Sequence, residues 1–463
     1  MSGADRERPM NTGGSLKIDG AAYVITVDAA RRVIADATVV VEGNRITHVD
    51  KADELRQVQV ERTIDAAGGV LTPAFINGHI HISYAHAARG LFPDDVQGRL
   101  RLREVFRLQH AMTEEEEYWT SLLAVIELVR SGTVSFVDPG STKYLDACLQ
   151  VYADAGCRVV TGTSLIDRSV DMALPTFSTE EALRRTEAFI RTYDHRLEGR
   201  VRAWAMPFST ETCSAELLAG ARRLADTYGT WATIHHSGGR PIDGRRPTEY
   251  LETIGALGPN VLLAHATDID DVEVDVVARS GASVVVCPST ALKEGSGLGQ
   301  RKVPELLGRG VNVGLGLDSA NSSNYLDAVR MMNAAAVGFK AGRLDTTVVP
   351  AEQALEMATT VGARALGLDG EVGSIEVGKK ADLVLFDARR AEWRALLDPV
   401  NNLVYSADGR SVRTVVADGR VVVDEGQVVF ADEAAVAERV QELGEALLAR
   451  TGTKVNRGRW PLG

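Results

Sequence analysis

Five polar side chains stand at the carboxyl ends of short apolar runs spread from residue 79 to residue 318. In a parallel barrel the carboxyl ends of all strands open onto one face, and enzymes with that fold place their catalytic groups there. Three imidazoles and a carboxylate suit a borderline-soft divalent cation, which leaves a fourth imidazole for proton transfer. The pattern therefore predicts a metal-dependent hydrolase. The five residues are His79, His81, His235, His265 and Asp318.

Between residues 71 and 371, strand-like runs alternate with amphipathic helical patterns. Eight such units predict an α/β fold, a (β/α)8 TIM-like barrel. An open doubly wound sheet is the alternative, but no GxGxxG sequence supports a dinucleotide site. The expected strands are 75–81, 133–138, 157–163, 202–207, 230–235, 261–265, 283–287 and 312–318.

Three helices have clear sequence signals. The first is expected over 113–129, because Thr113 and Glu116 have the spacing of a capping box and Gly132 follows as a stop. The segments 214–228 and 325–338 show similar patterns.

Short β-branched runs at both chain ends predict a second, smaller unit. They occupy 21–27, 39–41 and 45–49, and they return at 381–386 and 412–423. Because these segments bracket the barrel, we expect one small β-sandwich built from both ends. The predicted organisation is a sandwich part over 15–70, the barrel over 71–371, a second sandwich part over 372–431, and a C-terminal helix and tail over 432–463.

Bulk properties narrow the partners and the compartment. A chain of 463 residues suits a large barrel with an accessory domain, and its net charge of −12 argues against nucleic acid or an acidic membrane surface as partner. No apolar stretch approaches the roughly 20 residues that cross a bilayer. The polar segment 1–14 lacks the apolar centre of a secretory signal and is expected to be a flexible leader. The four dispersed cysteines predict reduced thiols in a cytoplasmic protein. The expected partner is a small-molecule substrate.

Strand alternation selects among the histidines. His79 and His81 are two residues apart, so one strand presents both on the same face. Of His235 and His236, alternation favours His235 as the inward-facing ligand and leaves His236 behind it or at the rim of the pocket. His86 is a candidate for the pocket mouth, with a surface or packing role as the alternative.

Asp318 is expected to point into the barrel. Gly314 and Gly316 share its face and leave room at the barrel centre. An isolated Asp at a strand end is often a helix N-cap instead, and that alternative remains open on local pattern alone.

Several motifs along almost the whole chain resemble the amidohydrolase superfamily, within it the branch of triazine chlorohydrolases and aromatic deaminases. The resemblance implies that His79, His81, His235 and Asp318 bind one divalent metal ion per chain, with His265 as a catalytic residue that is not a ligand. Zinc is expected, with iron, cobalt and manganese as alternatives, and members of this branch are commonly homo-oligomers. The motifs are 73–81, Arg89-Gly90, 131–138, 263–265, Cys287-Pro288, 316–318, 322–327 and 373–383.

Two positions depart from the deaminase pattern of that branch. The pattern has a Glu three residues after the fifth-strand His, where this chain has Gly238, and it tends to have a His where this chain has Phe208. In deaminases the Glu passes a proton to the ring nitrogen of the heterocycle, which glycine cannot do. Glu211 is either a substitute carboxylate or a rim residue. We predict that Phe208, Glu211, His236, Gly238 and His86 contact the substrate.

These departures favour hydrolysis of an amide, urea or carbamate of a partly apolar small molecule, as in the phenylurea and thiocarbamate hydrolases that resemble this branch. Asp318 would take the proton of the attacking water and pass it to the leaving nitrogen, while His265 orients the water or stabilises the oxyanion. The alternative is a deaminase or dechlorinase of an N-heterocycle of triazine, purine or pyrimidine type. A third hypothesis is a catalytically inactive barrel that serves as a scaffold.

Overall fold

The predicted barrel is confirmed by the computed structural model, which describes residues 14–92, 94, 96, 98–170, 173–298 and 301–455. Eight parallel strands are hydrogen-bonded in chain order, and the first and last meet where Gly78 N donates to Leu315 O over 2.8 Å. The segment 1–13 of the expected leader and the end of the tail, 456–463, lie outside the described residues. The barrel strands are β6 (Phe75–Asn77), β7 (Thr133–Val137), β8 (Arg158–Leu165), β9 (Val201–Pro207), β10 (Ala232–His236), β11 (Val261–His265), β12 (Ser283–Val286) and β13 (Val313–Leu315).

The barrel strands are short apolar runs because both of their faces are covered. Every residue of β7 and β12 is buried, as expected for parallel strands between a filled barrel interior and an outer layer of helices. Two strands end earlier than predicted: β6 stops at Asn77 and β13 at Leu315. The functional residues therefore lie on the turns that follow these strands.

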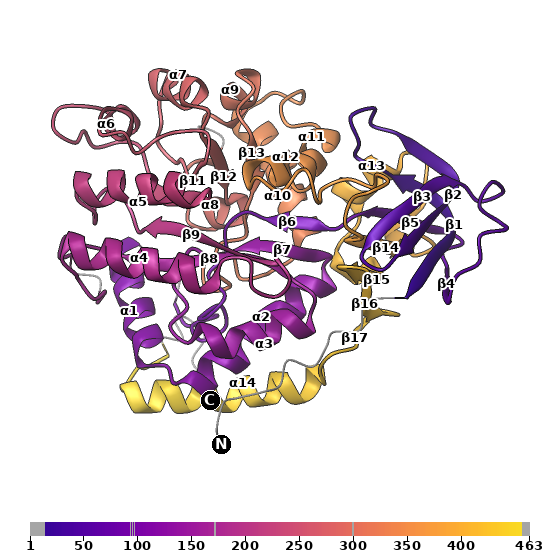
Figure 1. Ribbon diagram of the computed structural model, residues 1–463, viewed down its shortest axis with the longest axis horizontal. Coiled ribbons are helices and arrows are strands. Elements are labelled where there is room, and N and C mark those ends of the chain that lie inside the picture. The colour runs from indigo at the N-terminus through magenta and orange to yellow at the C-terminus, as the bar shows by residue number, and fades with distance from the viewer. Residues whose placement is uncertain are drawn as a thin grey trace.

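Helices cover the outside of the barrel (Figure 1). The predicted capping box is present on α2, where Glu116 N donates to Thr113 Oγ1 and Thr113 N donates to Glu116 Oε2. None of the helices in the described ranges combines the length and apolar character needed to span a bilayer. The helices are α1 (Gly98–Ala111), α2 (Glu114–Arg130), α3 (Leu145–Asp154), α4 (Thr179–Tyr193), α5 (Ala215–Tyr228), α6 (Pro247–Thr253), α7 (Asp271–Ser280), α8 (Pro288–Lys293), α9 (Val303–Gly308), α10 (Ala328–Arg343), α11 (Ala351–Met357), α12 (Thr360–Ala365), α13 (Pro399–Asn401) and α14 (Glu433–Thr451).

A second sheet combines strands from both chain ends, as predicted. Its nine strands form one continuous sheet beside the barrel (Figure 1), and the two ends of the chain join where β5 pairs antiparallel with β14. The predicted domain boundaries stay predictions. The strands are β1 (Ser15–Ile25), β2 (Val33–Glu42), β3 (Arg45–Lys51), β4 (Arg62–Asp65), β5 (Gly69–Pro73), β14 (Leu383–Asp387), β15 (Val412–Ala417), β16 (Arg420–Asp424) and β17 (Gln427–Val428).

A buried ion cluster connects the barrel to this second sheet. Arg158, the first residue of β8, donates to Asp382 Oδ2 over 2.8 Å and to Asp418 Oδ1 over 2.5 Å. Asp418 N also donates to Asp382 Oδ1 over 2.6 Å. All three side chains are less than a tenth exposed, so each charge depends on the others for compensation.

Candidate metal centre

Hydrogen bonds of the backbone and of the Asn77 side chain hold the ends of β6 and β13 side by side. Asn77 Oδ1 accepts from His79 N over 3.2 Å and from Leu317 N over 3.0 Å. Asp318 N donates to His79 O over 2.9 Å. A Cβ at Gly316 would lie 3.0 Å from His79 Cβ, so the missing side chain makes room for this histidine. The turns after the two strands therefore bring His79 and Asp318 together.

The five residues predicted from the strand ends meet in one cluster. Donor atoms of His79, His81 and Asp318 lie within 4.8 Å of one another, and so do those of His79, His235 and His265. His79 is completely buried, yet neither of its ring nitrogens has a hydrogen-bond partner. Since buried polar atoms are almost always paired, two orphaned nitrogens among other donor atoms indicate a place for a cation.

A carbonyl fixes the tautomer of His235. Phe208 O accepts from His235 Nδ1 over 3.0 Å, and because a carbonyl cannot donate, the proton must be on Nδ1. The lone pair of Nε2 is therefore directed elsewhere, and it lies 3.5 Å from His81 Nε2. On the other side of His81, Nδ1 lies 3.0 Å from Ser141 Oγ. Both rings thus present Nε2 to the cluster while Nδ1 is held from behind, which is how outer partners orient metal-binding imidazoles.

Burial keeps these histidines neutral. It is the largest cause that lowers the pKa of His79 and of His235 well below the usual value, and neighbouring histidines lower both further. Burial, with a smaller contribution from His265, lowers the pKa of His81 to about 3. Neutral imidazoles are the form that binds metals, so the site fits a divalent cation at neutral pH without first losing protons.

His265 and Asp318 have strained backbones. Their φ angles are +76° and +57°, in the left-handed region that residues with a Cβ rarely adopt. Such strain costs on the order of 1–3 kcal/mol and collects at functional sites.

His265 lies against the other histidines. Its ring centroid is 4.7 Å from that of His79, and its carbonyl accepts from Arg301 Nη1 over 3.3 Å. Its position is compatible with ligation as well as with proton transfer. The predicted role as a catalytic residue that is not a ligand stays a prediction.

Aromatic rings line one side of the cluster. Phe208 stacks on His235 with ring centroids 4.7 Å apart, and Tyr84 stacks on His81 at 5.2 Å. Phe106 of α1 packs edge-on against Phe208. The neighbourhood of the donor atoms is therefore apolar on this side, as the phenyl ring at Phe208 suggested.

The structure gives the surroundings of three residues predicted to contact the substrate, and their role in binding stays a prediction. His236 is buried and its Nε2 lies 2.8 Å from Thr248 Oγ1 of α6, because strand alternation turns it toward the helix layer. The His86 side chain is buried, and its Nε2 lies 3.1 Å from Glu127 Oε2 of α2. Glu211 is exposed on the turn after β9.

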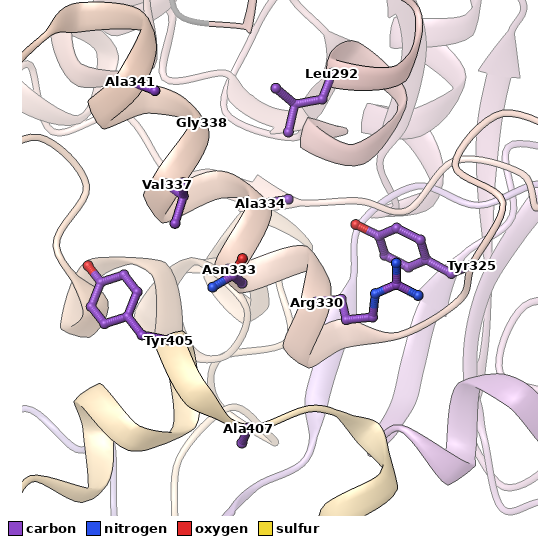
Figure 2. Close-up of a pocket in the computed structure, with 10 residues that line it drawn as sticks. All are labelled: Leu292, Tyr325, Arg330, Asn333, Ala334, Val337, Gly338, Ala341, Tyr405 and Ala407. Carbon is purple, nitrogen blue, oxygen red and sulfur yellow. The ribbon is translucent and has the colours of Figure 1, made fainter. Parts of the chain in front are cut away.

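A separate surface groove lies along α10. It has a volume of about 480 Å³, and none of its lining residues belongs to the donor cluster. Figure 2 shows Tyr325 and Arg330 at one end and Tyr405 at the other. The guanidinium of Arg330 lies 3.8 Å from the centre of the Tyr325 ring, so the one charged residue lining the groove is already engaged.

The amidohydrolase family model matches residues 70–422, which covers the whole barrel. The 5'-deoxyadenosine deaminase of Methanosarcina mazei is 33% identical over 93% of this chain and 98% of its own length. The 5-methylthioadenosine/S-adenosylhomocysteine deaminase of Syntrophobacter fumaroxidans is 33% identical over 92% and 96%. The chain belongs to the amidohydrolase family.

Solved structures agree with this assignment. An adenosine deaminase from Xanthomonas campestris with bound zinc superposes with a TM-score of 0.86, at 27% identity over 94% of this chain and 98% of that one. The atrazine chlorohydrolase of Arthrobacter aurescens complexed with zinc superposes at 0.82, with 23% identity over 93% and 100%, and shows the same fold. The predicted family and branch are confirmed, and this amidohydrolase is a hydrolase of carbon–nitrogen bonds.

Gly238 is required by packing in this amidohydrolase. A Cβ at this position would lie 2.3 Å from Asp268 O and 2.6 Å from Ile269 N, both backbone atoms of the segment after β11. A Glu at this position would not fit the present backbone, because the segment after β11 occupies the space where its Cβ would lie.

We expect Gly238→Ala and Gly238→Glu each to lower the free energy of unfolding by about 1–3 kcal/mol, because the added Cβ displaces backbone. Urea unfolding measures this change. Gly308→Ala is a suitable control, since a Cβ at that position meets no atom within 4 Å. Gly238→Glu should also fail to raise activity on any substrate. A stable Gly238→Glu variant with faster ammonia release would contradict the packing argument.

Two groups that orient predicted ligands had no such role in the sequence prediction. Ser141 stands behind His81, and the carbonyl of Phe208 fixes His235. Ser141 follows the quoted 131–138 motif by three residues, so proximity to that motif was a usable signal. A backbone carbonyl carries no signal in the sequence.

Proposed function

We propose that this amidohydrolase is a metal-dependent deaminase that removes the amino group of an adenine-type N-heterocycle by attack of water. The unpaired, buried nitrogens of His79 within the donor cluster are the observation that carries the hydrolytic chemistry. The named deaminases that match nearly full length support the heterocyclic substrate. Those matches favour the alternative, deamination of an N-heterocycle, over the predicted hydrolysis of an amide, urea or carbamate.

The residues that would hold the metal are His79, His81, His235 and Asp318. Their set of three neutral nitrogens and one carboxylate oxygen suits zinc, and two of the similar structures contain it. When bound, such an ion supplies Lewis acidity and lowers the pKa of water from about 15.7 toward about 7.

The remaining chemistry is assigned to the side chains themselves. Asp318 accepts the proton of the attacking water at a carboxylate oxygen and later delivers it to the leaving nitrogen, so ammonia departs neutral. His265 hydrogen-bonds the water and aligns its oxygen with the ring carbon. Phe208 and Tyr84 keep this side of the site apolar, which strengthens these charge interactions.

A second candidate function is hydrolysis of an open-chain amide, urea or carbamate. It is favoured by Gly238, because such substrates need no proton on a ring nitrogen. If the heterocycle is the substrate, that proton needs another donor, and Glu211 is the carboxylic acid that the sequence offers at the barrel mouth.

A substrate panel distinguishes the two candidates. Purified protein loaded with zinc should release ammonia from adenosine, 5'-deoxyadenosine, 5-methylthioadenosine or S-adenosylhomocysteine. Anilides, phenylureas and carbamates belong in the same screen. Turnover of these open-chain compounds alone would replace the first candidate with the second.

We expect Glu211→Gln to lower kcat/KM for the heterocycle by about 10²–10⁴-fold, the usual contribution of a general acid. Metal content should not change. Glu198→Gln is a control with no place in the proposed site. Near-normal ammonia release by Glu211→Gln would remove Glu211 from the mechanism.

A further inference from the structure

One carboxylate outside the donor cluster gathers four hydrogen bonds. Glu127, near the end of α2, accepts through Oε1 from Leu326 N over 2.8 Å and from Arg89 Nη2 over 2.9 Å. Through Oε2 it accepts from Arg89 Nη1 over 2.9 Å and lies 3.1 Å from His86 Nε2. Arg89 Nη2 also donates to Asn324 O over 2.8 Å. A bidentate arginine with two further donors is a strong and geometrically specific arrangement.

These donors come from two of the three segments that carry the predicted ligands; His235, on β10, is on the third. His86 and Arg89 follow His81 on the segment after β6, whereas Asn324 and Leu326 follow Asp318 on the segment after β13. Glu127 itself belongs to α2, a helix outside the barrel. The carboxylate therefore connects both segments to one rigid element.

The segment after β13 transmits this connection to Asp318. Ser323 N donates to Ser319 O over 2.9 Å, and Ser323 Oγ donates to Tyr325 O over 2.8 Å. Ser319 N in turn donates to Asp318 Oδ1 over 2.8 Å. Hydrogen bonds thus run without a gap from the carboxylate of Asp318 to the neighbourhood of Asn324.

Such a connection matters because the donor atoms of the cluster repel one another. His81 Nε2 lies 3.7 Å from Asp318 Oδ1 and 3.5 Å from His235 Nε2. Without a cation, lone pairs at these distances favour separation, and only the surrounding structure keeps them converged. Ligands held in place before binding raise metal affinity, because less order must be gained on binding.

We propose that Glu127 is a positioning residue that holds the segments after β6 and β13 in register and so raises the affinity of the centre for its metal. The inference rests on the proposed function, in that it takes the donor cluster to be a metal site. Direct ties between Asn77, His79 and Leu317 persist without Glu127, so we expect weakened binding, not its loss.

The test compares two variants of the same helix. Glu127→Gln keeps the size of the side chain and removes its charge. Glu116→Gln makes the same change at a buried carboxylate of α2 that Arg450 holds far from the cluster. Each protein is stripped with a chelator, its unfolding is measured without metal, and it is titrated with Zn²⁺ against a chromophoric chelator. Visible absorption of the Co²⁺ form reports the ligand geometry.

Glu127→Gln should weaken Zn²⁺ binding by about 10–100-fold and change the Co²⁺ spectrum, as replacement of outer partners does elsewhere. Glu116→Gln should leave both unchanged, even where it lowers stability equally. If Glu127→Gln fails to fold, Arg89→Lys serves instead, because it keeps the charge and loses the bidentate contact.

Two results overturn the proposal, and they can be told apart. A folded Glu127→Gln or Arg89→Lys protein with the affinity and Co²⁺ spectrum of the parent would reduce Glu127 to a structural contact. A parent protein that binds neither Zn²⁺ nor Co²⁺ would overturn the proposed function as well.

Discussion

Asp318→Asn is expected to abolish turnover, with kcat falling by about 10²–10⁴-fold or more while part of the metal is retained. The amide keeps the shape of the side chain and still offers one oxygen, but it cannot take a proton from water. The remaining donors, His79, His81 and His235, converge without it. Rates of ammonia release and metal analysis of the same preparation measure the two effects separately.

Asp345→Asn is a control for this substitution, because Asp345 is an exposed residue that caps the turn at Thr347. Its activity should match the parent protein. Full activity of Asp318→Asn with metal bound would remove the proton shuttle from the mechanism and leave His265 as the only base in the cluster.

Arg158→Met should lower the free energy of unfolding by about 3–5 kcal/mol at pH 7. The substitution removes the guanidinium that pairs with Asp382 and makes the shortest ion pair of Asp418, and breaking a buried pair by removing one partner costs that much. Arg279→Met is the surface control. Arg279 pairs with Glu252 at 2.6 Å, but both side chains are more than a third exposed, so a loss under about 1 kcal/mol is expected.

The effect of Arg158→Met should shrink in acid. Burial alone would raise the pKa of Asp418, but Arg158, Lys380 and Arg200 outweigh it and hold the pKa below its usual value. A carboxyl with a lowered pKa contributes stability above its unfolded pKa of about 3.9 and loses it as pH falls through the folded pKa. Without Arg158 the pKa of Asp418 rises, so this carboxyl is protonated at higher pH and the variant no longer buries its charge. Urea unfolding at pH 7 and near pH 4.5 compares the two; an equal loss at both would contradict this account.

The barrel could be predicted because its local signals agree with one another. Apolar strand runs alternate with capped helices, and the capping box from Thr113 to Glu116 placed the start of α2 within one residue. The sequence predicted β segments at both ends of the chain, but it did not predict that β5 pairs with β14. Its register depends on contacts between residues far apart in sequence, for which one sequence holds no local signal.

The donor cluster could be predicted from position, but its fine geometry could not. Strand ends identified His79, His81, His235, His265 and Asp318, because parallel strands open onto a common face. The left-handed turns at two of these residues result from tertiary packing that overrides backbone preference.

At Gly238 the sequence indicated a functional difference but not its packing cause. From the sequence, the missing side chain was interpreted as the loss of the acid that protonates a ring nitrogen. The structure adds that the backbone at Asp268 and Ile269 occupies the adjacent space. A steric requirement of this kind is created by a neighbouring segment and cannot be read from the residue itself.

The pairing of β5 with β14 also sets an order of events during protein synthesis. Residues 69–73 leave the ribosome about 300 residues before their partner at 383–387, which at roughly 5–20 residues per second is a delay of about 15–60 s. Throughout that interval the apolar edge of the N-terminal strands has no partner. We therefore expect nascent chains to depend on chaperones, and truncation before residue 383 to yield insoluble protein even though every residue of the donor cluster is already present.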